Sequence, residues 1–183
     1  MSANESRTGL KGEALPLGED EVISLLNQAK YLYLRQISEP EENSLRLVVE
    51  EAMADRSETG RARGSASPLA EILKDASPIK STDTCKTFEL RWSRYVAYLV
   101  TEEVVGSGGD HEGEIYSGNL FRVYTKSHFL DYLSRGTGGH IEPLLHYKLV
   151  CLNHLIDVAS YSPPEVRLLG KISESAGTKV RPN

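Results

Sequence analysis

Four polar side chains interrupt stretches of sequence that are otherwise apolar, and these residues could do chemistry. They are Arg94, Arg122, His154 and Asp157. An unpaired buried charge costs several kcal/mol, so each arginine needs a carboxylate or a bound anion, and a buried imidazole needs partners for both nitrogens. The residue types fit two interpretations. Either the arginines and Asp157 form a structural cross-strand network, or the arginines converge on the carboxylate or phosphate of a ligand.

Aromatic residues next to arginines form the second group of interest. The chain has nine tyrosines, and one segment combines arginine, tryptophan and tyrosine. These three residue types are enriched at the energetic centres of protein interfaces, although most tyrosines pack in cores. We therefore name eight candidate binding residues: Arg91, Trp92, Arg94, Tyr98, Arg122, Tyr124, His154 and Asp157.

Signatures of common enzymes and metal sites are missing. The sequence has no G-x-S-x-G elbow, phosphate-binding loop, H-E-x-x-H or calcium-binding loop. The glycine-rich runs at 106–110 and 135–140 do not join a strand to a long helix, so we interpret them as turns. The densest group of metal-ligand types runs from Asp110 to Glu114, and we interpret it as a solvated acidic turn. We assign no catalytic residue, metal or cofactor.

Charge and composition restrict the partners and the compartment. The formal net charge is −5 and the isoelectric point is about 5.6, which argues against nucleic acid or an anionic membrane and favours a basic protein partner. No apolar run approaches the roughly 20 residues of a membrane span, so we expect a cytoplasmic protein. Cys85 and Cys151 have no metal-ligand spacing and are expected to be reduced structural thiols.

The segment from Lys86 to Glu103 must position several of the candidates. Its even positions are mostly apolar and its second half is apolar at odd positions too, which predicts a long strand at the centre of a sheet, with Arg94 inside it. Because about 17 residues exceed the usual strand length, we expect a bend or bulge near Ser93. We expect the core to include Trp92, Val96, Tyr98, Leu152 and Ile156.

Local signals predict the other elements. Apolar spacing, capping residues and turn residues indicate a helix at 19–29, a hairpin of strands at 31–37 and 45–49, a short helix after Ser67, a strand at 118–126, a helix from Ser127 to Gly136 and an edge strand at 165–169. Residues 146–160 fit both a strand buried on two faces and a helix. We favour the strand because of its β-branched content.

These elements predict an α+β fold. We expect a single domain over 17–170 with a largely antiparallel, curved sheet and two or three helices packed on one face. Outside it we expect a mobile N-terminal tail at 1–16 and a frayed C-terminal tail at 171–183, and within it a mobile loop at 55–67 that lacks apolar residues to bury.

Three functions fit these patterns. The first is a non-catalytic binding protein that acts through protein–protein interaction, for example of the immunity or antitoxin type. The second is a small enzyme or anionic-ligand-binding domain with a pocket of arginine, tyrosine and histidine. The third is a structural subunit of a homo-oligomer. We favour the first because the sequence lacks a catalytic constellation and combines acidic charge with aromatic residues.

Overall fold

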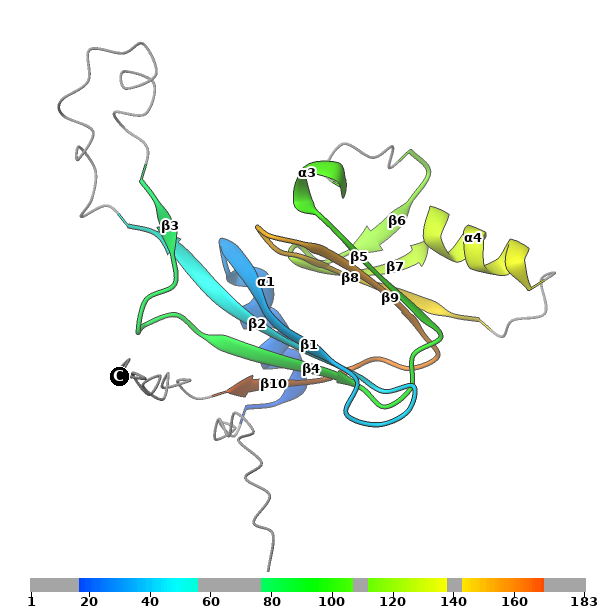
Figure 1. The fold of residues 1–183 in the computed structure, drawn as a ribbon, viewed down its shortest axis with the longest axis horizontal. Helices are drawn as coiled ribbons and strands as arrows, with labels where there is room; N and C mark the ends of the chain where they lie inside the picture. The colour runs from blue at the N-terminus through cyan, green and yellow to red at the C-terminus, as the bar shows by residue number, and fades with distance from the viewer. Residues whose placement is uncertain (1–16, 56–76, 107–111, 138–142, 170–183) are drawn as a thin grey trace, which may run out of the picture.

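Residues 17–55, 77–106, 112–137 and 143–169 are described in a computed structural model of the chain (Figure 1). Both expected tails, the expected loop at 55–67 beyond its first residue and the short helix expected after Ser67 lie outside these residues.

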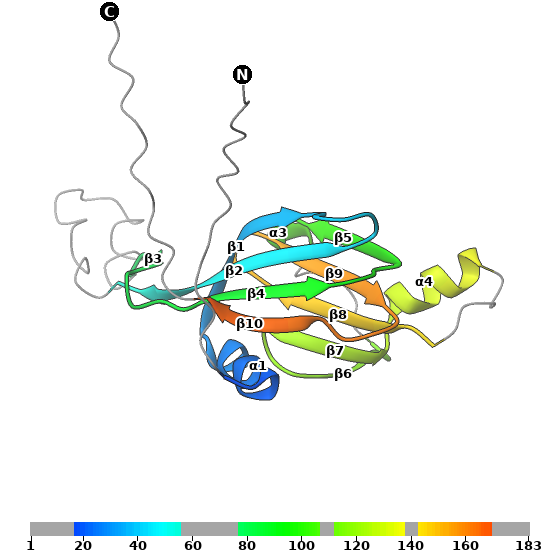
Figure 2. The same cartoon turned by 90° about the horizontal axis from the view of Figure 1, so that it is seen from below.

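Ten described strands form two antiparallel sheets. Sheet I has the order β1 (Tyr31–Ser38), β2 (Leu45–Ala54), β4 (Thr87–Trp92) and β10 (Glu165–Leu169), with β3 (Ile79–Lys80) paired to β2. Sheet II has the order β5 (Ala97–Thr101), β9 (Leu155–Ser160), β8 (Leu145–Val150), β7 (Phe121–Lys126) and β6 (Ile115–Ser117). Figure 2 shows the two sheets as separate layers. The predicted α+β, mostly antiparallel character is confirmed, whereas the single sheet is not.

The core lies between the inner faces of the two sheets. Alternate residues of each strand point inwards, so Phe88, Leu90 and Trp92 of β4 share one cluster with Tyr147 and Leu149 of β8. The rings of Trp92 and Tyr147 meet edge to face with centroids 5.8 Å apart. Each large apolar side chain buried in this way contributes about 1.5 to 3 kcal/mol, so the two sheets are held together mainly by this cluster.

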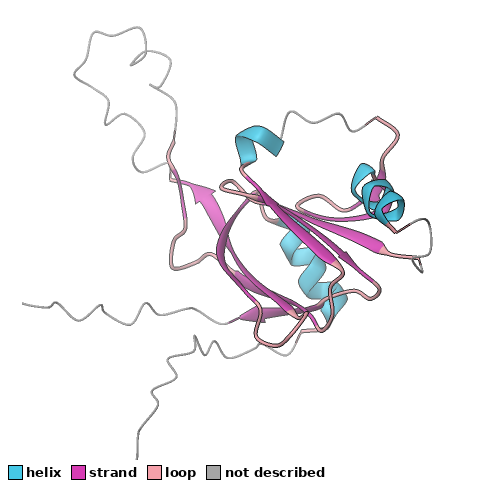
Figure 3. Cartoon of the chain, turned by 45° about the vertical axis from the view of Figure 1, so that its right-hand side comes forward, coloured by secondary structure: helices cyan, strands magenta, loops and turns pink. Residues whose placement is uncertain are grey.

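The helices occupy different parts of the molecule. Helix α1 (Glu19–Gln28) lies against β10 and β7 (Figure 3). Its Val22 and Leu26 belong to the core cluster. Helix α4 (His128–Gly136) contacts β8 of sheet II. A third, four-residue helix, α3 (Glu103–Gly106), follows β5. The helices expected at 19–29 and after Ser127 are therefore confirmed, but they do not share one sheet face.

The expected long strand at 86–103 is wrong. It divides into β4 of sheet I and β5 of sheet II, and the chain crosses between the sheets where the bend was predicted. The backbone N–H of Tyr95 donates to the carbonyl of Asn43 in sheet I's first hairpin, and that of Val96 donates to Ala159 of β9. Because these bonds divert the chain, Arg94 is exposed in the crossing and is not buried in a strand.

Residues 146–160 also differ from the prediction. They form strands rather than a helix, as favoured, but they make the hairpin of β8 and β9 in place of one strand. The turn is closed by the backbone N–H of Cys151, which donates to the carbonyl of His154 over 3.0 Å. Of the expected core residues, Trp92 and Ile156 are fully buried, Tyr98 and Leu152 are partly buried, and Val96 is exposed.

Most of the other described strands agree with the sequence. β1 and β2 form the expected hairpin, and β10 is the expected edge strand. The strand expected at 118–126 is β7, while its short partner β6 was not predicted. Cys85 and Cys151 are not bonded to each other, and burial raises the pKa of the Cys151 thiol to about 12, so this residue serves packing.

Candidate functional site

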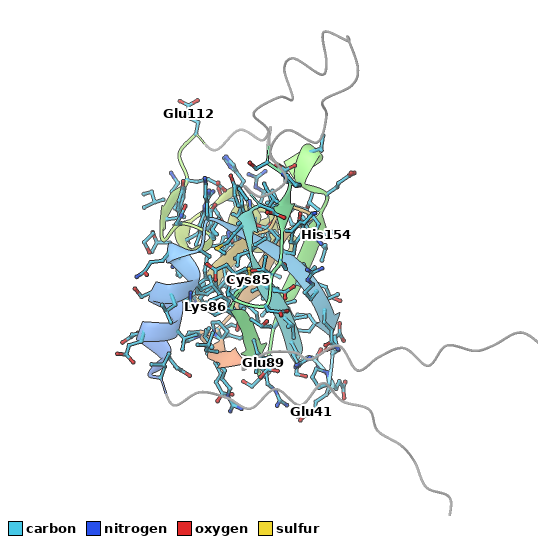
Figure 4. The ribbon with its side chains drawn as sticks, turned by 90° about the vertical axis from the view of Figure 1, so that its left-hand side faces the viewer. Glu41, Cys85, Lys86, Glu89, Glu112 and His154 are labelled. Carbon is cyan, nitrogen blue, oxygen red and sulfur yellow. The ribbon has the colours of Figure 1, made fainter. Side chains whose placement is uncertain are left out.

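The eight candidate residues do not form one site. Arg122, Tyr124 and Asp157 lie on the outer face of sheet II, the face turned away from sheet I. Arg91, Arg94 and Tyr98 lie at or beside the crossing between the sheets. Two others are separate, since Trp92 is in the core and His154 is in the turn between β8 and β9. Figure 4 shows His154 well separated from Glu41, which lies in the loop beside the crossing.

The outer face of sheet II carries rows of side chains that follow the strand register. One row runs from Arg122 through Lys148 and Asp157 to Leu99. The next row runs from Tyr124 through His146 to Ala159. Directly opposed side chains on one face of a sheet interact, so this register brings charged and aromatic groups together.

A buried polar network occupies the middle of this face. Asp157 Oδ1 lies 2.8 Å from His146 Nε2 and 3.2 Å from Lys148 Nζ. The Tyr124 ring stacks on the imidazole with centroids 4.4 Å apart. A network that joins Asp157 to Arg94, one of the two interpretations of the sequence, is not formed, because histidine and lysine from the adjacent strand β8 are the partners of this carboxylate.

The network continues to Ser127 and has the residue types of a hydrolase triad. Ser127 Oγ lies 2.9 Å from His146 Nδ1. However, Ser127 is only 2% exposed, and its Oγ accepts the N–H of Leu130 over 3.2 Å as the N-cap of α4. A nucleophile must reach a substrate carbonyl, whereas this hydroxyl is held beneath the first turn of a helix. In this geometry the Ser127–His146–Asp157 chain fixes α4 on sheet II.

The expected pocket of arginine, tyrosine and histidine is not assembled. The Arg122 guanidinium lies 4.8 Å from the centroid of the Tyr116 ring, and its Nε donates to the carbonyl of Asn119. The hydroxyl of Tyr124 and Nδ1 of His154 are buried without a hydrogen-bond partner among the described residues. They belong to different places, since Tyr124 is in mid-strand and His154 is in a turn. Arg122 therefore interacts with Tyr116 and Asn119, and not with Tyr124 or His154.

Most charged side chains on the outer face of sheet I are paired across strands. Arg35 bonds to Glu50 over 2.6 Å, and Arg46 bonds to both Glu89 and Gln36. This is the structural ion-pair ladder that the sequence suggested, but other residues form it. Such pairs neutralise the charges on the polar face of the sheet. Each contributes little to the stability of the protein when it is exposed.

A second candidate site lies at the crossing, where two tyrosines share one carboxylate. We call Glu39, Glu41, Arg91, Tyr95 and Tyr98 the tyrosine surface. The hydroxyls of Tyr95 and Tyr98 donate to the same oxygen of Glu39 over 2.9 and 3.1 Å, and their rings meet edge to face at 5.1 Å. These hydrogen bonds to the Glu39 carboxylate raise the pKa of both tyrosines above the ordinary value of 10, because an ionised phenol could not donate them.

The backbone beneath the tyrosine surface is held in place by the loop between β1 and β2. Asn43 has a left-handed backbone (φ 59°), and its carbonyl accepts the N–H of Tyr95. Ser44 Oγ bonds to the backbone of Glu41, whose carboxylate accepts Arg91 Nη2 over 3.1 Å. The sequence pointed to Arg91 and Tyr98, but it missed Glu39 and Tyr95. The acidic turn at 39–42 was the available signal.

Neither the metal-ligand residue types in the described part of the chain nor similarity to known proteins adds a further site. Among the described residues, no helix could span a membrane, and no group of three histidine, cysteine, aspartate or glutamate side chains could hold a metal ion. Comparison of the chain with protein-family models, with curated proteins and with solved structures yields no match.

Proposed function

We propose that this protein is a non-catalytic binding protein that recognises another protein through the tyrosine surface. The observation that carries the proposal is the pair Tyr95 and Tyr98, fixed by one carboxylate at the protein surface. Tyrosine offers a large contact area and a polar tip, and side chains that are already ordered lose less entropy when a partner binds. Arginine, present here as Arg91, is the other residue type typical of binding hot spots.

Charge favours a partner with a basic segment. Glu41 and Glu42 are exposed in the loop that follows Glu39, and the chain as a whole carries a formal charge of −5. Complementary rim charges mainly accelerate association, and salt screens them. We therefore expect binding to slow as ionic strength rises. An acidic protein that blocks a basic partner, as immunity and antitoxin proteins do, fits this description.

The geometry of sheet II gives less support to an enzyme or a binder of small anions. Ser127 caps α4, and Arg122 is engaged by Tyr116 and Asn119. Asp157 already balances Lys148. An anion would find Nε of Arg122 already bonded and the charge of Lys148 already balanced.

A photo-cross-linking experiment in cells tests the proposal. Benzoylphenylalanine replaces Tyr95 in one variant and Tyr132 in a control, because Tyr132 is 72% exposed on α4, outside the tyrosine surface. Irradiation is expected to attach one defined protein to position 95 and not to position 132. Equal labelling from both positions, or none from position 95, would contradict the proposal.

A further inference from the structure

Strand β5 forms one edge of sheet II and exposes apolar side chains. Leu99 is 50% exposed and Val100 is 37% exposed. Val104, in the helix that follows, is 75% exposed. An edge strand also presents unpaired backbone N–H and C=O groups, so an apolar edge is a template for another strand.

The other sheet edges in the described part of the chain are covered, charged or short. The β8–β9 turn covers the edge of β1, because Leu152 N–H donates to Leu32 and the Asn153 amide bonds both backbone groups of Leu34. β10 carries Glu165 and Arg167 and contacts α1. β6 has only three residues. The five residues of β5 include neither a charge nor a proline, which are the usual protections of an edge.

We propose that β5 pairs antiparallel with β5 of a second copy of this chain and so joins two copies of sheet II. The pairing does not rest on the proposed function, because it is argued from the strand edge around Leu99 and not from the hydroxyls of Tyr95 and Tyr98, although Tyr98 belongs to both surfaces. The sequence of β5 is self-complementary about Leu99. Antiparallel pairing places Leu99 opposite its own copy and Tyr98 opposite Val100 of the second copy, so aromatic and β-branched side chains meet without a like-charge contact.

The charges beyond the ends of β5 favour a second copy as the occupant. Arg94 lies just before the strand, and Glu102 and Glu103 follow it. Among the described residues, none of these three side chains makes a hydrogen bond or ion pair. Antiparallel pairing brings Arg94 of one copy to the same end as Glu102 and Glu103 of the other, at both ends of the interface.

The size of the strand predicts a dimer that dissociates on dilution. Stable interfaces bury about 1,200 Å² or more in total. A five-residue strand with Val104 beside it offers a small apolar centre, so the complex should form in a concentration-dependent way.

Sedimentation velocity of the full chain tests the pairing. As concentration rises, the mass should increase from 20.2 kDa towards twice that value. Leu99→Lys should abolish the increase, whereas the control Ile115→Lys, on the opposite edge strand β6, should leave it unchanged. Thermal unfolding of each variant checks that it is folded.

A charge exchange tests the antiparallel register. Arg94→Glu should weaken the dimer at least several-fold, and combining it with Glu102→Arg and Glu103→Arg should restore it. A chain that stays monomeric at the highest concentration, a dimer that survives Leu99→Lys, or a charge exchange without restoration would overturn the inference. None of these results would affect cross-linking of a different protein at position 95, so failure of the dimer and failure of the proposed function are distinguishable.

Discussion

At the scale of single residues, Asp157 is the centre of the buried polar network on the outer face of sheet II. One of its oxygens meets both His146 and Lys148, and the lysine side chain is only 12% exposed. A buried pair is weak evidence for stability, because desolvation offsets much of the attraction. Removing only one partner is different, since it leaves a charge in a poorly solvated place.

Replacement of Asp157 should therefore show strong coupling to Lys148. We expect Asp157→Asn to lower the free energy of unfolding by about 2 to 4 kcal/mol, and addition of Lys148→Met to recover much of this loss. Urea denaturation of the single and double variants measures the coupling. Glu165→Gln, which removes an exposed pair with Arg167, is the control and should change stability little. Additive effects of the two sheet II changes would contradict the account.

At the scale of elements, one asparagine in the β8–β9 turn of sheet II is bonded to the edge strand β1 of sheet I. Asn153 Oδ1 accepts the N–H of Leu34 over 2.9 Å, and its Nδ2 donates to the carbonyl of the same residue over 3.0 Å. The pairing of β1 with β2 is irregular between Leu34 and Gln36, directly at this contact. The side-chain amide thus replaces a neighbouring strand at the edge of β1.

Loss of this amide should loosen the edge of β1. We expect Asn153→Ala to destabilise the protein by about 1 to 3 kcal/mol, because two backbone groups of a half-buried strand lose their partner. Amide hydrogen exchange at Leu34 should accelerate more than exchange in β4. Asn119→Ala is a matched control, since that amide bonds to Asn27 at an exposed position. Unchanged exchange at Leu34 would show that Asn153 does not hold the strand.

The contrast between local and distant bonds explains what the sequence could predict. The helix after Ser127, the hairpin from Tyr31 and α1 follow from caps, periodicity and turns within a few residues. The division of 86–103 and the turn within 146–160 depend on bonds between residues distant in sequence, Tyr95 with Asn43 and Asn153 with Leu34. No pattern within either segment contains that information.

The same dependence on contacts distant in sequence explains the outcome for the candidate site residues. Treating Arg94 as buried was wrong because the strand that would have buried it divides. Asp157 does lie in a polar network, as one interpretation held, but its partners come from β8. The Glu39 carboxylate joined to Tyr95 and Tyr98 could not be predicted, because it requires the first hairpin to meet the crossing between the sheets.

At the scale of the whole molecule, a titratable tyrosine in the core between the sheets makes the stability of the protein depend on pH in the alkaline range. Tyr147 packs between Trp92 and Phe121, and burial raises its pKa to about 12. A raised pKa means that the folded state keeps a proton that the unfolded state loses. The stability contribution is therefore complete below the unfolded value of about 10 and is lost as pH rises through 12.

The stability of the protein should accordingly fall between pH 10 and 12. Tyr147→Phe should make this part of the pH profile flatter, because the ring remains and the titrating hydroxyl is gone. Tyr132→Phe, at an exposed position, serves as the comparison. Thermal or urea unfolding across this pH range measures the effect, and identical slopes for wild type and Tyr147→Phe would exclude a buried tyrosine as the cause.

The central claim is that the molecule acts through the tyrosine surface, and the affinity of the protein captured at position 95 tests it most directly. Tyr95→Ala should weaken that affinity by a factor of about 30 or more, the level of a binding hot spot near 2 kcal/mol. Tyr132→Ala should leave it within about twofold. Calorimetric titration of the folded variants gives both values. A dissociation constant for Tyr95→Ala equal to that of the wild type would contradict the account.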